Sequence, residues 1–233
     1  HTGTNGSINL TGGYSKGWIT GAGINFNHRK NKINLYGDIS YSRIKGPFSI
    51  DKYDRISADG TIFEKEINID RIDTTILVNG RVGLDYEVTK KTLIGILLTG
   101  NNRHFTQAEQ TRSMALKNNL TDTITTFLNN ELNDWTDYGI NFNVNHNFKE
   151  SSNLILNLDH IHYKNDQPVN YFATNYDGNG DFVYNENTRS GKITYFNFWV
   201  AALDYKSKIG KNISLETGFK QTVSSFQNNI SFH

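Results

Sequence analysis

The stretch Tyr138-Gly-Ile-Asn-Phe-Asn-Val-Asn-His-Asn-Phe148 decides the fold, because two kinds of side chain alternate along it. Every even position except His146 is apolar or aromatic, whereas the odd positions from Asn141 to Asn147 are all asparagine. A helix would scatter these residues around its circumference, but a strand puts them on two opposite faces. The stretch therefore predicts a β-strand with one apolar face and one polar face.

The same alternation recurs along the chain, most clearly over 22–27, 33–42 and 72–88. It predicts an all-β, antiparallel, up-and-down fold of about nine strands. Several of them reach or exceed the roughly 9–11 residues with which a tilted strand crosses a bilayer. They are also longer than the usual soluble strand of about 5–6 residues. The predicted strands cover residues 7–14, 18–28, 32–43, 72–88, 91–104, 134–148, 152–164, 191–205 and 211–225.

The connections between these strands alternate in length. The short ones are basic and cover residues 29–32, 89–91, 149–153 and 206–211. Apart from 15–17, the intervening ones are long, and we expect ligand-binding loops at 44–71, 105–133 and 165–190. Within these loops, segment 107–119 has weak helical character. It could instead form strands that project above a membrane. Tight turns on one side and long loops on the other are typical of an outer-membrane barrel, whereas a soluble sandwich distributes its loops without such parity.

The composition excludes several classes of protein. With a mean hydropathy of -0.57, the chain is not a helical membrane protein. Without cysteine, it has neither a disulfide framework nor thiolate chemistry. Its net charge of +1 gives no electrostatic reason to expect nucleic acid as a partner. The aromatic content of 12% argues against a disordered chain.

In a membrane barrel the apolar face points to lipid and the polar face lines a wet interior. In a soluble barrel or sandwich the apolar face is the core instead, and periodicity alone does not distinguish the two. Strand length, loop parity and aromatic residues near strand ends favour the membrane. The predicted lumen-facing residues are Asn25, Asn27, Arg81, Asp85, Asn141, Asn143, Asn145, Glu216 and Lys220. The predicted membrane-interface aromatics are Trp18, Tyr41, Tyr86, Trp135, Tyr138, Phe148 and Tyr205.

Three segments, 7–17, 21–27 and 32–42, carry a family resemblance. The last reads Lys-Ile-Asn-Leu-Tyr-Gly-Asp-Ile-Ser-Tyr-Ser. Together they resemble the opening barrel strands of TonB-dependent outer-membrane receptors, in particular the branch described as the outer membrane protein beta-barrel family. The resemblance covers the whole chain in pattern, and its motifs are specific only over about 7–43.

The resemblance implies a barrel, usually of 22 strands, in the cell outer membrane. Residues 1–233 would be the N-terminal portion of this one barrel domain, without the plug domain. The start at His1 and the end at His233, in apparent mid-strand, fit a fragment. The implied function is TonB-dependent uptake of a scarce nutrient, such as an iron chelate, an oligosaccharide or a peptide. The implied partners are outer-membrane lipid, a small nutrient ligand, and the plug domain and TonB energy-coupling system through parts missing here.

The chemical motifs are weak. Asp177, Asn179 and Asp181 resemble the start of an oxygen-ligand loop for calcium, but Thr188 stands where such a loop needs a glutamate. A Gly-rich hairpin turn explains the same residues. His160 and His162 share a strand face, as a metal-binding pair does, but no third ligand is apparent.

No catalytic motif is present, so we expect no enzyme activity, no cofactor and no nucleic-acid partner. Two other functions compete with transport. One is a small structural or adhesive outer-membrane β-barrel without transport, in which the first and last strands have to pair. The other is a soluble, carbohydrate-binding β-sandwich.

Overall fold

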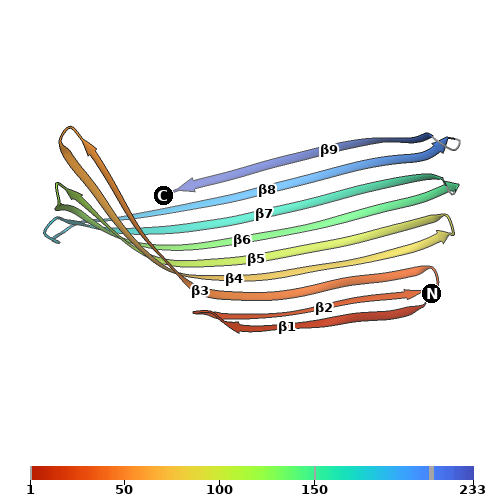
Figure 1. Cartoon of the computed structure of the whole chain (residues 1–233), viewed down its shortest axis with the longest axis horizontal. Helices are drawn as coiled ribbons and strands as arrows, with labels where there is room; N and C mark the ends of the chain where they lie inside the picture. Colours follow the sequence, from red (N-terminus) through yellow and green to blue (C-terminus); the bar gives the residue numbers. More distant parts are fainter. Residues whose placement is uncertain (1, 150, 210–212) are drawn as a thin grey trace.

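The computed structural model describes residues 2–149, 151–209 and 213–233. They form nine antiparallel β-strands, which lie in a single sheet in the order of the sequence (Figure 1). This part of the chain contains no helix long and apolar enough to span a membrane. The strands are β1 (Gly3–Tyr14), β2 (Trp18–Lys30), β3 (Ile33–Ala58), β4 (Thr61–Thr89), β5 (Thr92–Lys117), β6 (Leu120–Lys149), β7 (Ser152–Asp177), β8 (Phe182–Ile209) and β9 (Ile213–Phe232).

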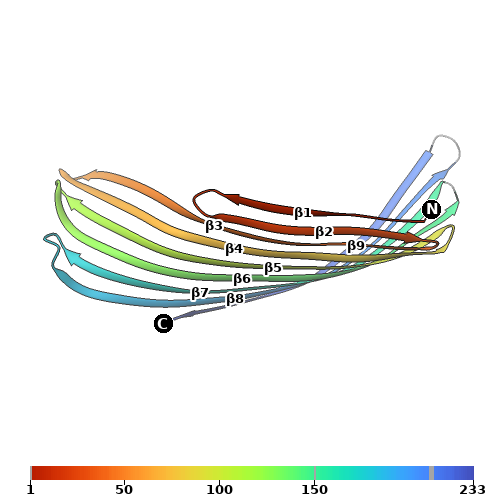
Figure 2. The same ribbon diagram turned by 90° about the horizontal axis from the view of Figure 1, so that it is seen from below.

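The sheet is a single curved layer, and none of the described residues forms a second layer over it (Figure 2). Each strand pairs only with its neighbours in sequence. Among the described residues, β1 and β9 do not pair with each other, so both are open edges. The prediction of an all-β, up-and-down fold with nine strands is confirmed.

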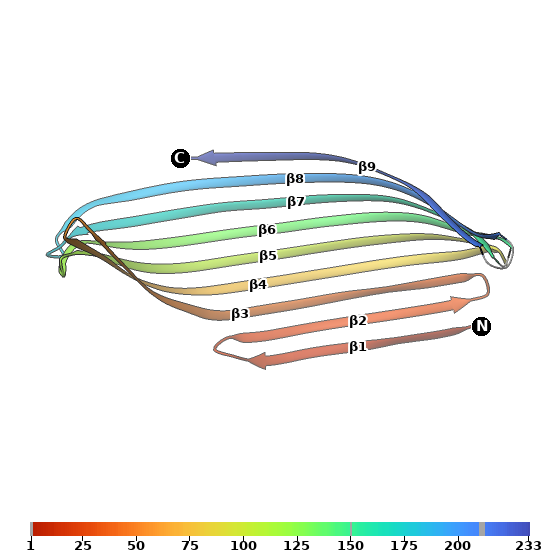
Figure 3. The ribbon, with the colours of Figure 1, turned by 45° about the horizontal axis from the view of Figure 1, so that its top comes forward.

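The prediction of long loops at 44–71, 105–133 and 165–190 is wrong as a statement of structure. These segments continue the strands as three long hairpins, which extend past the short β1–β2 hairpin (Figure 3). Segment 107–119 is likewise strand up to Lys117, rather than helix. The alternation of apolar and polar residues fades there because both faces of these extensions carry many polar side chains, and a strand without an apolar face has no period-two signal.

Two hairpin tips are built from residues that tolerate a left-handed backbone. Asp59 and Gly60 have φ values of 47° and 76°, and Asn118 and Asn119 have values of 49° and 64°. Two successive positive φ values define the type I′ turn, whose twist matches that of the flanking strands. Tight turns therefore replace the predicted loops.

The two faces of the sheet differ in exposure as well as in chemistry. Of the side chains buried among the described residues, only Ser152 lies outside the face that carries Asn141, Asn143 and Asn145. Side chains converge on the concave side of a curved layer and spread apart on the convex side, so the asparagine-bearing face is the concave one. The buried side chains on this concave face are those of Gln107, Thr111, Ser113, Asn129, Asn133, Asn165, Val169, Ala173, Asn175 and Thr194.

Candidate functional site

The pairing register assigns every strand residue to one of two faces. We call the face with Asn141, Asn143 and Asn145 the polar face, and the opposite one, with Ile140 and Phe142, the apolar face. All nine residues predicted to face a lumen lie on the polar face. They are Asn25, Asn27, Arg81, Asp85, Asn141, Asn143, Asn145, Glu216 and Lys220.

Asparagine side chains on the polar face are hydrogen-bonded in chains that cross the sheet. The Asn143 side-chain amide donates to Asn141 Oδ1 at 2.9 Å, and the Asn141 amide donates to Asp159 Oδ1 at 2.6 Å. A second chain links β2, β3 and β4 through Asn27, Asn34 and Asp85. Because these side chains bond to one another, the polar face is an ordered wall.

Several charges on the polar face are paired with a charge on another strand. Arg81 contacts Asp38, Lys206 contacts Glu216, and Arg29 lies 4.0 Å from the carboxylate of Glu87. Pairs this exposed add little to stability. Each pair joins one positive and one negative side chain, so these pairs add no net charge to the polar face and give it no preference for anions or cations.

An aromatic cluster interrupts the polar face on β7, β8 and β9, and sequence reasoning missed it. The rings of Phe196 and Phe226 lie 4.5 Å apart, and those of Phe196 and Phe198 lie 5.8 Å apart. Tyr163, on β7, brings a third strand into the cluster, and its ring lies 6.0 Å from that of Phe196. The run Tyr195-Phe-Asn-Phe-Trp199 carries aromatic residues on both faces, and this doubling is the signal that would have revealed the cluster.

Trp135 was predicted to be a membrane-interface residue, but it lies on the polar face. There the Arg103 guanidinium stacks over its ring at 4.6 Å. Trp135 and Tyr138 are three residues apart on β6, so their side chains lie on opposite faces of the sheet. Strand alternation alone therefore corrects the prediction for Trp135. The other six aromatics of that prediction share the apolar face: Trp18, Tyr41, Tyr86, Tyr138, Phe148 and Tyr205.

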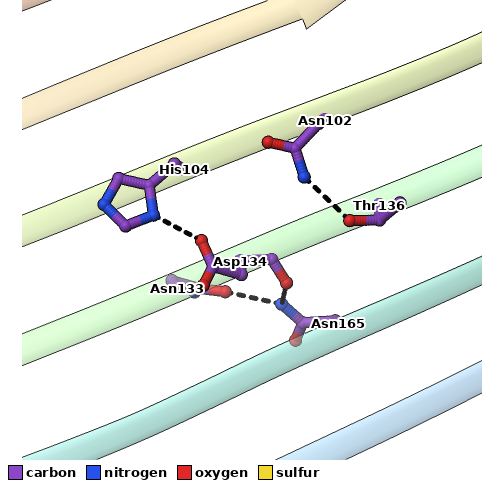
Figure 4. A network of polar contacts seen from close by, with 6 residues as sticks. All are labelled: Asn102, His104, Asn133, Asp134, Thr136 and Asn165. Atoms are coloured by element: carbon purple, nitrogen blue, oxygen red, sulfur yellow. Dashed lines mark hydrogen bonds and ion pairs between the residues drawn. The ribbon is translucent and has the colours of Figure 1, made fainter.

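A proline breaks the ladder between β6 and β7, and a buried asparagine bridges the gap. Pairing is interrupted between Glu131–Val169 and Asp134–Asp166, where Pro168 has no N–H to donate. The Asn165 side-chain amide donates to Asn133 Oδ1 at 2.5 Å and to the Asp134 carbonyl at 3.2 Å (Figure 4).

Beside that gap, His104 contacts Asp134 at 2.6 Å, and Asn102 donates to Thr136 at 2.8 Å (Figure 4). Both contacts join β5 to β6, and within the described residues His104 makes no hydrogen bond to a hydroxyl that could serve as a nucleophile.

The candidate calcium loop forms the tip of the β7–β8 hairpin. Asp177 Oδ1 accepts hydrogen bonds from the backbone N–H groups of Asn179 at 2.9 Å and Asp181 at 3.0 Å. Gly180 has a φ of 90°, which favours glycine. This carboxylate oxygen therefore closes the turn. Over the described residues, no group of three or more histidine, aspartate or glutamate side chains is arranged to hold a metal ion.

His160 and His162 lie on the apolar face, where each stacks on a neighbouring ring. The His160 ring lies 4.0 Å from Trp199, and the His162 ring lies 4.8 Å from Tyr138. His162 Nδ1 is also 2.7 Å from Asn197 Oδ1. These contacts tie the pair to its ring neighbours.

Fold and faces together define an all-β protein built as one two-faced, up-and-down sheet. No protein-family model matches the sequence, and no curated protein matches it. Solved structures that it is similar to include the toluene transporter TodX of P. putida, with 9% identity, a TM-score of 0.23, and coverage of 99% of this chain and 77% of that one. The ferric preacinetobactin receptor BauA of Acinetobacter baumannii has 9% identity, a TM-score of 0.19, and coverage of 97% and 55%. At these TM-scores, neither likeness bears on function.

Proposed function

We propose that this chain is part of the wall of an outer-membrane β-barrel, with its apolar face in lipid and its polar face lining the lumen. The observation that carries the proposal is the division of faces. Ile140 is 45% exposed and Phe142 is 37% exposed, while the hydrogen-bonded asparagines beside them lie on the concave side. A soluble sandwich would cover the apolar face with a second layer, and the described residues provide none.

Aromatic rings at the edge of the apolar face support a membrane orientation. Trp18, Tyr41, Tyr138 and Trp199 lie level with positions 45, 41, 39 and 37 of β3. From β2 to β8 the level of the rings shifts by eight residues along the strands over six strand-to-strand steps. At about 3.3 Å per residue and about 4.8 Å per strand, this shift corresponds to strands tilted by about 40° from the membrane normal. Transmembrane barrels tilt their strands by about 35–45°.

The apolar band has the height of a bilayer core. On β6 it runs from Tyr138 to Phe148, with a ring at each end. Ten steps of about 3.3 Å at this tilt rise by roughly 25 Å, which is the height of the apolar band of outer-membrane barrels. The rest of β6, from Leu120 to Asp137, extends beyond the band.

On this orientation, the three long hairpins project outward and the basic turns lie on the inner side. We propose that the hairpins over 44–71, 105–133 and 165–190 bind the ligand, and that the full barrel imports a scarce nutrient in a TonB-dependent way. The imported nutrient would be an iron chelate, an oligosaccharide or a peptide. The partners in this proposal are outer-membrane lipid, a plug domain and the energy-coupling system, with no nucleic acid and no enzyme activity of its own.

The open edges of β1 and β9 support a wall that further strands complete, because an unpaired edge is not tolerated in lipid. They count against the alternative of a small structural or adhesive barrel made of these nine strands alone. That alternative requires β1 to pair with β9, and the described residues show no such pairing.

Single cysteines along β6 test the orientation, and residues 1–233 contain no native cysteine. The substitutions are made in the complete gene, and the protein is isolated with the outer membrane. We expect a water-soluble maleimide to label Asn141→Cys, Asn143→Cys and Asn145→Cys, and to leave Ile140→Cys, Phe142→Cys and Val144→Cys unlabelled until detergent is added. Equal labelling of both sets would refute a lipid-facing apolar face.

Energy coupling needs its own test, because the orientation experiment does not address it. Cells that carry the complete gene are compared with and without TonB during growth on limiting nutrient. We expect the advantage conferred by the gene to vanish without TonB. An advantage that persists without TonB would replace active import with passive diffusion or adhesion.

A further inference from the structure

Strand β3 continues past the end of the β1–β2 hairpin and leaves a long free edge there. β2 pairs with β3 only as far as Ile44, whereas β3 runs on to Ala58 with β4 as its one partner among the described residues (Figure 3). A further strand on the far side of β1 would lie three strand spacings, about 14 Å, from this edge, which is too far for pairing. The edge is therefore open above the short hairpin.

The register shows which backbone groups this edge presents. The Glu87 N–H donates to the Lys32 carbonyl at 2.8 Å, in the register of β3 with β4. Because hydrogen-bonded pairs alternate along an antiparallel ladder, the even residues of β3 bond to β4 and the odd residues point their N–H and C=O groups away from it. Within the described part of the chain, five such N–H groups have no partner: those of Ser49, Asp51, Tyr53, Arg55 and Ser57.

A proline marks the start of the free edge. Pro47 is an odd residue, so its missing N–H lies on the unpaired side, where proline costs no ladder hydrogen bond. Proteins usually blunt an open edge with prolines or bulges. From Phe48 to Ala58, β3 has no further proline, and its pairing with β4 shows no register shift. The edge is therefore regular enough to accept another strand.

The β3–β4 hairpin also offers different surfaces on its two sides. The side that continues the polar face carries six apolar side chains, and three of them, Phe48, Ile56 and Phe63, are 44%, 66% and 45% exposed. The other three are Ile50, Ile67 and Ile69. The opposite side is polar, and its side chains contact one another: the Asn68 amide donates to Asp51 at 2.8 Å, and Arg55 lies 3.6 Å from Glu64.

An extended peptide fits both features of this hairpin. The free groups recur at every second residue, about 7 Å apart, which is the backbone repeat of another strand. Adding a strand to an open edge is an established mode of peptide recognition, in which main-chain hydrogen bonds give affinity and alternate side chains give specificity. Side chains of an added strand would lie alternately beside the apolar and the polar side of the hairpin.

Resting on the transport function proposed above, we propose that the β3 edge over 47–57 binds the imported nutrient, and that this nutrient is a peptide held as an added β-strand. Its apolar side chains lie beside Phe48, Ile50 and Ile56, and its polar side chains lie on the opposite side. The proposal selects the peptide from the three nutrient classes, because neither an iron chelate nor an oligosaccharide repeats alternating amide donors and carbonyl acceptors.

Hydrogen exchange in the complete protein tests whether the edge is free and whether a peptide covers it. The probe is a synthetic peptide in which threonine and valine, both strong strand formers, alternate between terminal lysines. Without the probe, we expect the odd amides from Ser49 to Ser57 to exchange faster than the even amides between them. The probe should slow the odd amides. Odd amides that are already protected without the probe would mean that another part of the protein covers the edge, which overturns the site.

Two N-methylated forms of the probe test the backbone pairing itself. Antiparallel pairing is the more stable arrangement, and with valine on the apolar side it points the threonine N–H groups to β3. We therefore expect methylation of the threonine nitrogens to abolish binding, measured by fluorescence anisotropy of a labelled probe, and methylation of the valine nitrogens to preserve it. The reverse result supports a parallel strand at the same edge. Equal binding of both forms overturns the proposal.

A matched pair of variants at one position tests the edge from the side of the protein. Ser49→Pro removes one free N–H without breaking the β3–β4 ladder, and should weaken binding of the probe by about fivefold, as for one hydrogen bond. Ser49→Ala loses the same hydroxyl contact with Asp70 but keeps the N–H, and should bind like the unmodified protein. Equal affinities of the two variants would count against the edge.

Failure of the site is distinguishable from failure of the proposed function. If the cysteines of β6 label as expected and growth depends on TonB, but the probe changes no exchange rate along β3, the peptide site is overturned and transport of another nutrient stands. If the cysteine labelling contradicts a lipid-facing apolar face, the proposed function is refuted, whatever the edge of β3 binds.

Discussion

At the scale of single residues, Asn165 is a buried side chain that joins β6 to β7 at the break in their pairing. It is 5% exposed and donates to both Asn133 and the Asp134 carbonyl beside the proline gap. Asn165→Ala leaves those buried acceptors without a donor, which costs about 1–3 kcal/mol of unfolding free energy. Urea unfolding of the complete protein in lipid vesicles measures the loss. Asn170→Ala, at an exposed position of the same strand, is the control and should change stability little.

Tyr53, on the β3–β4 hairpin beyond the apolar band, offers a test by titration. Its hydroxyl donates to the Glu64 carboxylate, and this hydrogen bond raises the pKa of the Tyr53 phenol. A raised phenol pKa means that the contact stabilises the fold below the unfolded value of about 10 and stops doing so as the pH rises through the folded value.

We therefore expect Glu64→Gln to lower the pKa of Tyr53. The difference in absorbance at alkaline pH between each protein and its Tyr53→Phe counterpart isolates this one phenol. Glu66→Gln is the comparison, because Glu66 raises the same pKa by charge alone and less strongly. A Tyr53 pKa that stays unchanged in Glu64→Gln would show that the hydrogen bond is absent in solution.

At the scale of elements, the sequence predicted strands best where their two faces differ in polarity. On β6, the alternation around Phe142 identified both the strand and its faces. Above Tyr138 both faces carry polar residues, so the period-two signal disappears although pairing continues. Asp59-Gly60 is a strong hairpin signal that periodicity ignores, and considering it would have replaced the predicted loop 44–71 by a hairpin.

The candidate site was predictable only in part, for a related reason. Alternation assigned residues such as Asn141 to one face, but sequence spacing says nothing about which strands are neighbours. The aromatic cluster needs Tyr163, Phe196 and Phe226 to come level on three strands, and the bridge at Asn165 needs the β6–β7 register. Register comes from turn geometry and pairing.

The tip of the β3–β4 hairpin gives a prediction at this scale. Gly60 has a φ of 76°, so Gly60→Ala places a Cβ in a left-handed conformation and should destabilise the tip by about 1 kcal/mol. Hydrogen exchange of the amides near Ile62 should accelerate accordingly. Gly46→Ala, on β3 where nothing lies within 4 Å of the added Cβ, should leave exchange unchanged. Equal effects of both substitutions would contradict the type I′ turn.

At the scale of the whole molecule, the apolar face and the ring positions together give a direction for the membrane normal if the apolar face meets lipid, as proposed. The rings from Trp18 to Trp199 follow a line oblique to the cross-strand rows, and a flat sheet standing upright in a bilayer would keep them in one row. The obliqueness is the stagger that closing a sheet into a barrel requires. Strand length, ring positions and curvature thus agree on one geometry.

Polarised infrared spectroscopy of the complete protein in oriented bilayers tests this geometry without mutation. The dichroism of the amide I band should give a mean strand tilt of about 40° from the bilayer normal. The control is the same chain dried without lipid, which should show no preferred orientation. Strands lying near the bilayer plane would mean that the sheet rests on the membrane surface by its apolar face, and the polar face would then meet bulk water rather than a lumen.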